Sequence, residues 1–125
     1  MCLAAAPIAA VDPPQVIVSS LETRELRDFE KNPPAIQALI VSCLELTTRS
    51  LGYKMGSADP TQGGMDCSGA IYCTLRQAGV ADVPRSSHEQ YRWVWQSGRF
   101  RAVCGSTFDS FEFSALRPGD LLFWT

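Results

Sequence analysis

The sequence predicts a single domain of mixed helices and strands, the α+β class, on three observations. With 125 residues and 46% hydrophobic content, the chain can bury about two thirds of its unfolded surface in one core. Apolar residues recur at helical spacing over 36–51 and 71–78. Two short apolar runs, 16–18 and 121–124, are typical of strands.

Residues 1–34 are predicted to be a lead-in to this domain. Met1 to Ala10 are small and apolar but lack a basic segment, so they are either the remnant of a signal peptide or a simple extension, too short to span a membrane. We expect a linker at Pro13-Pro14, a strand at 16–18 and a charged helix beginning near Ser20.

The next segment predicts a core helix followed by a glycine-rich loop. Asn32 is expected to cap this helix, with proline in its first turn. Its apolar stripe consists of Ile36, Leu39, Ile40, Cys43, Leu44, Thr47 and Leu51. The loop over 52–66 contains glycines that allow unusual backbone angles and close approach to a ligand.

Two further helices and a turn complete the pattern. A helix over 68–78 should end at Gly79, and Ser86 or Ser87 should cap the helix after it. A proline-glycine turn over 116–120 then leads into a buried strand over 121–124, with Asp120 fixing the turn.

Charge and cysteine usage exclude several classes of function. The net charge is −2 and the basic residues are scattered, so nothing indicates nucleic acid or anionic membrane as a partner. Five cysteines without a CxxC pair argue against a disulfide framework and a zinc site, and no metal or cofactor is indicated. Cys43 and Cys73 lie on apolar helix faces and are predicted to be buried, as free cysteines commonly are.

Cys67 differs from the other cysteines because it follows the glycine-rich loop and begins a helix. Helix N-termini carry unsatisfied N–H groups and about half a positive charge, which favours a thiolate. Papain-like peptidases use this arrangement for their nucleophile. By position alone, a nucleophile and one more buried thiol are equally good interpretations.

Four motifs in order around Cys67 favour the nucleophile. The chain carries Tyr53 with Gly56, then Gly63-Gly64-Met65-Asp66-Cys67-Ser68-Gly69, then Val83-Pro84-Arg85-Ser86-Ser87-His88-Glu89-Gln90, then Leu116-Arg117-Pro118-Gly119-Asp120-Leu121-Leu122-Phe123. Over residues 35–125 the sequence therefore resembles the NlpC family of cell-wall cysteine peptidases, and residues 1–34 lie outside the resemblance.

The resemblance implies a papain-like α+β fold with helices packed on a central antiparallel sheet. It also implies that Cys67 attacks the stem peptides of bacterial peptidoglycan, commonly after D-glutamate, without a cofactor. The location implied is the bacterial cell envelope, periplasmic or secreted.

The same resemblance assigns Tyr53 to the catalytic site, as a hydroxyl near the thiol that helps with the oxyanion or the substrate, against a packed tyrosine below the loop. Asp66 either pairs with a free stem amine or caps the helix, and capping is favoured. Ser68 either contributes its backbone or hydroxyl to the site or fills the first turn.

Arg85 and Ser87 match the family's Pro-Arg-x-Ser motif, which lines the substrate groove or holds the adjoining loop. An arginine also suits the carboxylates of stem peptides, but a structural role is favoured. The aromatic residues Trp93, Trp95, Phe100, Phe108, Phe111 and Phe113 are interpreted as core, with a sugar-stacking surface as the alternative.

The sequence has a single histidine, His88, and we reject it as the catalytic base. In the family this position varies, and the catalytic histidine begins a strand after the Pro-Gly-Asp-Leu-Leu-Phe turn. Within these 125 residues the base is therefore missing, and hydrolysis should be very slow. We expect a fragment of a longer enzyme, a cleaved enzyme whose second chain carries the histidine, or a relic. The rival hypothesis is a noncatalytic stem-peptide-binding module or partner subunit.

Overall fold

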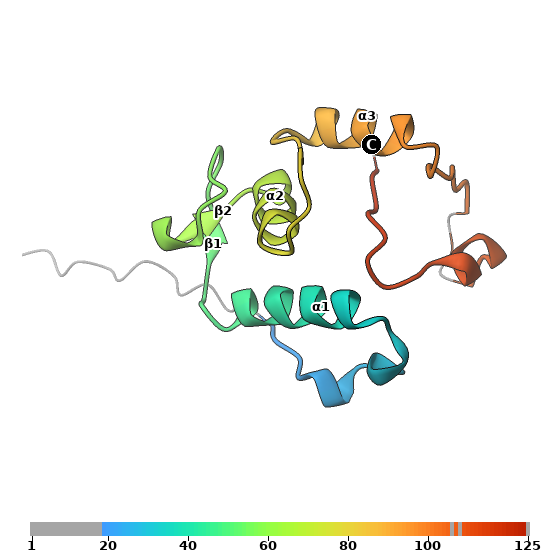
Figure 1. The fold of residues 1–125 in the computed structure, drawn as a ribbon, viewed down its shortest axis with the longest axis horizontal. Coiled ribbons are helices and arrows are strands. Elements are labelled where there is room, and N and C mark those ends of the chain that lie inside the picture. The colour runs from blue at the N-terminus through green and yellow to red at the C-terminus, as the bar shows by residue number, and fades with distance from the viewer. Residues whose placement is uncertain (1–18, 106, 108, 125) are drawn as a thin grey trace, which may run out of the picture.

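The structure is a computed structural model that describes residues 19–105, 107 and 109–124 (Figure 1). Three α-helices carry most of the regular structure: α1 (Pro34–Thr47), α2 (Cys67–Gln77) and α3 (Ser87–Gln96). The remaining elements are two short strands and four 3-10 turns, namely η1 (Thr23–Glu25), η2 (Phe29–Lys31), β1 (Gly52–Tyr53), η3 (Pro60–Gln62), β2 (Gly64–Met65) and η4 (Phe111–Ala115).

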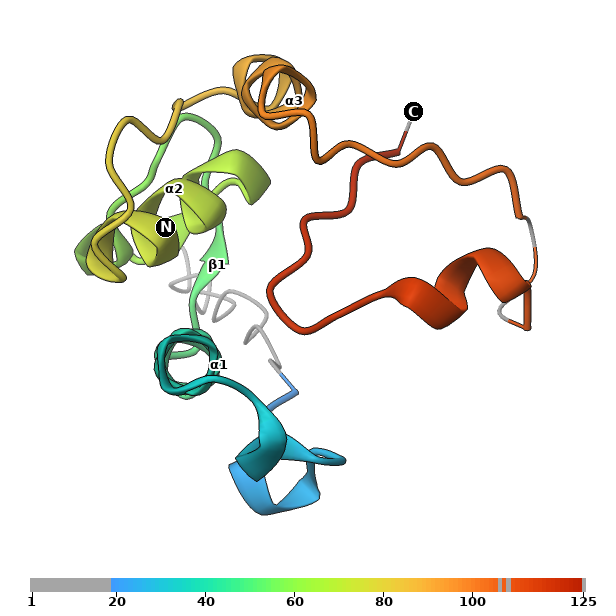
Figure 2. The same cartoon turned by 45° about the vertical axis from the view of Figure 1, so that its right-hand side comes forward.

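Helix α2 lies between α1 and α3 in both ribbon views (Figures 1 and 2). It contacts both helices. The segment after α3 runs away from the three helices, forms η4 and then turns back toward them. Helix α2 begins at Cys67, which confirms the predicted helix at this motif, and the presence of both helices and strands is consistent with the predicted α+β class.

The helix ends follow the sequence with one exception. Pro34 is the first residue of α1, as predicted, but Pro33 occupies the capping position. The Asn32 side chain instead donates to the carbonyls of Asp28 and Phe29 at 3.2 and 3.0 Å, so the prediction that Asn32 caps α1 is wrong. These bonds hold the Asn32 amide against the preceding residues, whereas a cap needs its side-chain oxygen to accept from the first turn of α1.

Helix α2 ends as predicted, at a glycine with positive φ. Gly79 adopts φ +84°, and its N–H donates to the Arg76 carbonyl at 3.0 Å. The Val80 N–H donates to the Leu75 carbonyl, also at 3.0 Å, which completes a Schellman motif.

The sheet differs from the expected central antiparallel sheet. Among the described residues, β1 and β2 form a two-stranded parallel sheet, with Gly52 opposite Gly64 and Tyr53 opposite Met65. The η3 turn lies between them and returns the chain to the same direction. Gly64 has no alternative here, because a Cβ would lie 2.5 Å from the Gly52 carbonyl oxygen.

Three other predicted elements are wrong or untested. The helix expected from Ser20 is replaced by the 3-10 turns η1 and η2, with Asp28 at positive φ between them. The strand expected over 121–124 has no regular structure, and Trp124 is 88% exposed. A strand is stable only when a neighbour pairs with its backbone. The strand expected at 16–18 lies outside the described residues.

The proline-glycine turn before that segment is confirmed. The Asp120 N–H donates to the Arg117 carbonyl at 3.0 Å, and the Asp120 carboxylate accepts from the Arg117 N–H at 2.8 Å. Gly119 adopts φ +97° within the turn. Asp120 therefore fixes the turn, as the sequence suggested.

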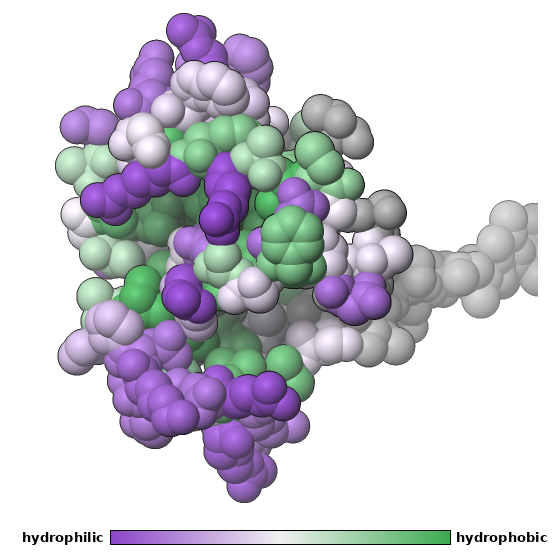
Figure 3. Space-filling view, turned by 90° about the vertical axis from the view of Figure 1, so that its right-hand side faces the viewer, coloured by the Kyte–Doolittle hydropathy of each residue, from purple (hydrophilic) through white to green (hydrophobic). Residues whose placement is uncertain are grey.

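Buried side chains gather around α2 and are largely polar. The buried apolar residues are Met65, Cys73 and Val83, whereas the buried polar residues are Ser57, Asp66, Ser68, Thr74 and Gln90. Two aromatic residues expected in the core are exposed instead, Trp95 at 58% and Phe111 at 84%, while Phe108 lies outside the described residues. One face also gathers apolar side chains around a hollow (Figure 3).

The loop that precedes η3 packs directly on the first turn of α2. The Asp66 N–H donates to the Ser57 carbonyl at 3.1 Å. A Cβ at Gly69 would overlap that same carbonyl oxygen and would lie 2.9 Å from Asp66 Oδ1. Glycine at 69 therefore lets the loop and the helix approach each other.

We predict that Gly69→Ala destabilises the protein by about 1–3 kcal/mol, because the added methyl group meets backbone. At an open helix position the same change stabilises by about 1 kcal/mol, so the sign is diagnostic. Urea unfolding followed by circular dichroism measures the difference. Gln77→Ala, at an exposed position of α2, is the control, and a Gly69→Ala protein as stable as wild type would contradict the close approach.

Candidate functional site

Cys67 is the first residue of α2 and is exposed. The chain reaches it from β2, and Asp66 between them has extended backbone, φ −85° and ψ 171°. The N–H groups of a first helical turn have no carbonyl partner within the helix, so they and the helix dipole favour a thiolate at this end. The structure thus places a reachable thiol where negative charge is favoured.

The Asp66 carboxylate caps this helix and also holds the loop beside it. Oδ1 accepts from the Gly69 N–H at 2.6 Å, and Oδ2 accepts from the Gly56 N–H at 2.7 Å. The Ser68 hydroxyl donates to Oδ1 at 3.2 Å. One buried side chain therefore joins the helix start to the loop before η3.

Arg85 completes the partners of this carboxylate in a bidentate ion pair. Nη2 lies 2.8 Å from Asp66 Oδ2, and Nη1 donates to Asp66 Oδ1 and to Ser68 Oγ, each at 3.0 Å. The guanidinium thus bonds the residues on both sides of Cys67. Paired planar groups of this kind give strong, directional contacts.

The charges of this pair shift the pKa of each partner. Hydrogen bonds from Arg85 hold the pKa of the Asp66 carboxyl well below its usual range; burial opposes this shift, and bonds from Gly69, Gly56 and Ser68 reinforce it. The pKa of Arg85 is raised, chiefly by its hydrogen bond with Asp66, and the nearby Cys67 also contributes. Arg85 therefore places a fixed positive charge near the thiol.

Gln90 also contacts this site, although the sequence analysis assigned it no role beyond its place in the motif over 83–90. Its side chain is 2% exposed. Nε2 donates to the carbonyls of Ser68 and Pro84, at 2.9 and 3.0 Å. These partners lie 22 and 6 residues away in sequence, so no periodic pattern marks the contact in the sequence.

Tyr53 and Ser87 lie outside the hydrogen-bond network of Asp66. Tyr53 is paired in register with Met65, two residues before Cys67, and is 68% exposed. Its hydroxyl donates weakly to Met55 Sδ at 3.9 Å. Ser87 is the exposed first residue of α3, which is capped by the neighbouring Ser86.

His88 is exposed in the first turn of α3. The adjacent Glu89 is occupied by the helix cap: Ser86 Oγ donates to Glu89 Oε2 at 2.8 Å and accepts from the Glu89 N–H at 3.3 Å. Hydrogen bonds to its carboxylate from the Ser86 side chain and the Ser86 backbone lower the pKa of Glu89.

The other described cysteines differ from Cys67 in their surroundings. Cys73 is buried, as predicted, but Cys43 is exposed, which corrects the prediction that it is buried. Partial burial of the sulfur raises the pKa of the Cys43 thiol, and a hydrogen bond with Thr74 offsets part of this shift. Cys104 is exposed, and its N–H donates to Glu112 Oε1 at 3.2 Å.

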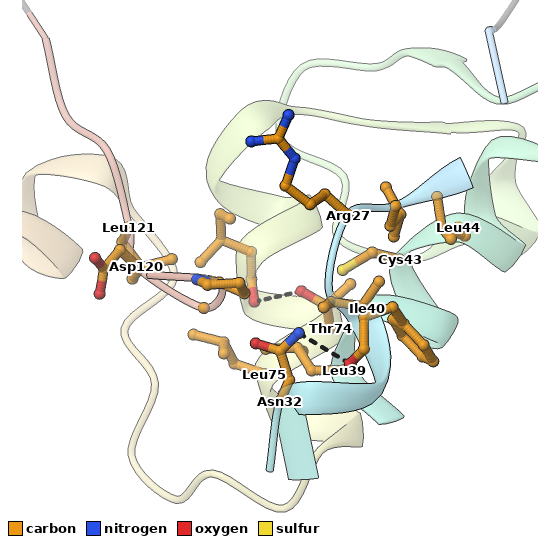
Figure 4. A pocket seen from close by; sticks show the side chains of 15 residues that line it. Arg27, Asn32, Leu39, Ile40, Cys43, Leu44, Thr74, Leu75, Asp120 and Leu121 are labelled. Atoms are coloured by element: carbon orange, nitrogen blue, oxygen red, sulfur yellow. Dashed lines mark hydrogen bonds between the residues drawn. The ribbon is translucent and has the colours of Figure 1, made fainter. Parts of the chain in front are cut away.

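A separate groove of about 490 Å³ lies between α1, α2 and the turn before residue 121. Figure 4 shows Ile40 and Cys43 of α1 facing Thr74 and Leu75 of α2, with Leu121 on the opposite side. Cys67 does not line it. Over the described ranges, no group of three metal-ligating side chains occurs. No helix in this part of the chain could cross a membrane.

Comparison with protein-family models confirms the family resemblance. The model of the NlpC/P60 family matches residues 50–125. The chain belongs to the NlpC/P60 family. This is a family of cell-wall cysteine peptidases, and a peptidoglycan substrate fits the family. No curated protein and no solved structure matches the sequence.

We predict that Asp66→Asn weakens the acid dependence of stability. Because the folded-state pKa of Asp66 lies below the unfolded value of about 3.9, its contribution is complete above that value and is lost as the pH falls toward the folded-state pKa. Wild type should therefore lose stability more steeply than Asp66→Asn below about pH 4.

Urea unfolding midpoints measured from pH 7 to pH 2 test this prediction. Glu45→Gln, which removes an exposed carboxylate on α1, is the control. If Asp66→Asn and wild type run parallel over the acid range, the ion pair does not hold the carboxylate as described.

Proposed function

We propose that this chain is the nucleophile-bearing part of a peptidoglycan cysteine peptidase, in which Cys67 attacks stem peptides, commonly after D-glutamate. The observation that carries the proposal is an exposed thiol at the first position of α2, with a bidentate ion pair bonding the residues on both sides of it. The bacterial cell envelope is the proposed location.

In the proposed reaction the Cys67 thiolate adds to the scissile carbonyl carbon. The carbonyl oxygen becomes an oxyanion, and we propose that N–H groups of the first turn of α2 and the Tyr53 hydroxyl stabilise it. Collapse of this intermediate expels the amine, which needs a proton from a general acid. Water then releases the peptide from the thioester.

Asp66, Ser68 and Arg85 are proposed to define the site by holding its backbone. Their polar atoms already bond one another, and Asp66 also accepts from Gly56 and Gly69. A contact with a stem amine or carboxylate would have to replace one of these bonds. Ser87, the fourth residue assigned to substrate binding, is exposed, and we propose that it touches the substrate.

The base and acid of the reaction are proposed to come from a histidine outside these 125 residues. His88 is the single histidine of the sequence, and its exposed position in the first turn of α3 supports its rejection as the base. General acid–base catalysis contributes about 10²–10⁴-fold to the rate. We therefore expect these residues alone to hydrolyse stem peptides more slowly, by about that factor, than the same site supplied with the histidine.

We predict that iodoacetamide at pH 6.5 alkylates Cys67 about tenfold faster than Cys43. Cys67 is exposed at a helix N-terminus, an end that attracts negative charge, whereas partial burial raises the pKa of the Cys43 thiol. Mass spectrometry of tryptic peptides measures each site, and Cys67→Ser identifies the Cys67 signal. Alkylation of Cys67 no faster than that of Cys43 or Cys104 would end the nucleophile proposal.

The second candidate is a noncatalytic module that binds stem peptides. The two candidates differ when a segment carrying the missing histidine strand is added. We predict that cleavage of muropeptides, measured by chromatography of the products, then rises by at least about 10²-fold and is absent in Cys67→Ala. Saturable binding without any gain in cleavage would instead support the binding module.

A further inference from the structure

We propose that Gln90 is a positioning residue for Cys67: its buried amide holds the first turn of α2 in the orientation that activates the thiol. The inference rests on the proposed function of Cys67. Gln90 is 2% exposed and has the largest fully buried side chain among the described residues. It is a polar group in a place where an apolar side chain of similar volume would avoid the cost of burying an amide.

The two hydrogen bonds of Gln90 join segments that meet only at the site. Nε2 donates to the Ser68 carbonyl at 2.9 Å and to the Pro84 carbonyl at 3.0 Å. Ser68 follows Cys67, and Pro84 precedes Arg85. One amide group therefore fixes the residue after the nucleophile and the residue before the guanidinium relative to α3.

Gln90 and Arg85 together hold both sides of Cys67. Arg85 bonds the Asp66 carboxylate and the Ser68 hydroxyl, whereas Gln90 bonds the Ser68 backbone. With its flanking residues tied, α2 cannot rotate about its axis without breaking these bonds. The direction of the thiol and its distance from the Arg85 charge are thereby set. A displacement of about 1 Å at such a site can cost about 10²-fold in rate.

Two variants test the role. Gln90→Met keeps the volume and removes both donors. Gln90→Glu keeps the shape and can donate a single hydrogen bond only while it is protonated. Gln96→Met, at an exposed position of the same helix, is the matched control. The measurement is the alkylation rate of each cysteine by iodoacetamide between pH 5 and pH 9, read by mass spectrometry.

We expect Gln90→Met to slow Cys67 alkylation at pH 6.5 by about tenfold and to move its pH–rate profile to higher pH, with Gln96→Met unchanged. Gln90→Glu should fall further behind wild type as the pH rises and the carboxyl loses its proton. Cys43 and the buried Cys73 should react as in wild type in both variants, which shows that the fold is intact.

Two outcomes would overturn the inference. One is that the Cys67 profiles of both variants superimpose on wild type. The other is that all cysteines change together in both variants, because the amide then supports the fold in general and not the thiol. Failure of the proposed function is distinct: it appears in wild type itself, as a Cys67 no more reactive than Cys43.

Discussion

The arrangement around Cys67 depends on one interaction, the ion pair between Asp66 and Arg85. The buried Asp66 carboxylate accepts hydrogen bonds from the Gly69 and Gly56 N–H groups as well as from the guanidinium. A buried charge is costly unless it is paired and fully bonded, so each of these partners is needed to keep it ionised. The helix start, the preceding loop and the segment before α3 are consequently fixed to one another.

This constraint explains how a small structure can present an exposed thiol at a helix start. Among the described residues, the buried apolar side chains are Met65, Cys73 and Val83, and polar bonds supply much of the order at the helix start. Because Asp66 and Ser68 are bonded inward, Cys67 between them is the residue left exposed.

The sequence predicted the local features of the site but not its long-range contacts. Helix α2, its Asp66 cap and its Gly79 end follow from residue types at fixed spacings. Of the two serines that the sequence offered as the cap of α3, Ser86 is the one that caps it. The bonds from Arg85 and Gln90 cross 19 and 22 residues, where side-chain type alone does not specify a partner. The strand expected over 121–124 failed because hydrophobicity predicts burial, whereas a strand also needs a paired neighbour.

The most direct test of the central role of Asp66 is an NMR titration of the folded protein that follows the Asp66 carboxyl carbon and the Gly56 and Gly69 amide protons. If one ionised carboxylate holds both N–H groups, the three signals should change together, with a common midpoint well below the ordinary aspartate value of about 3.9. A carboxyl midpoint near that value, or amide signals that do not follow it, would contradict the account.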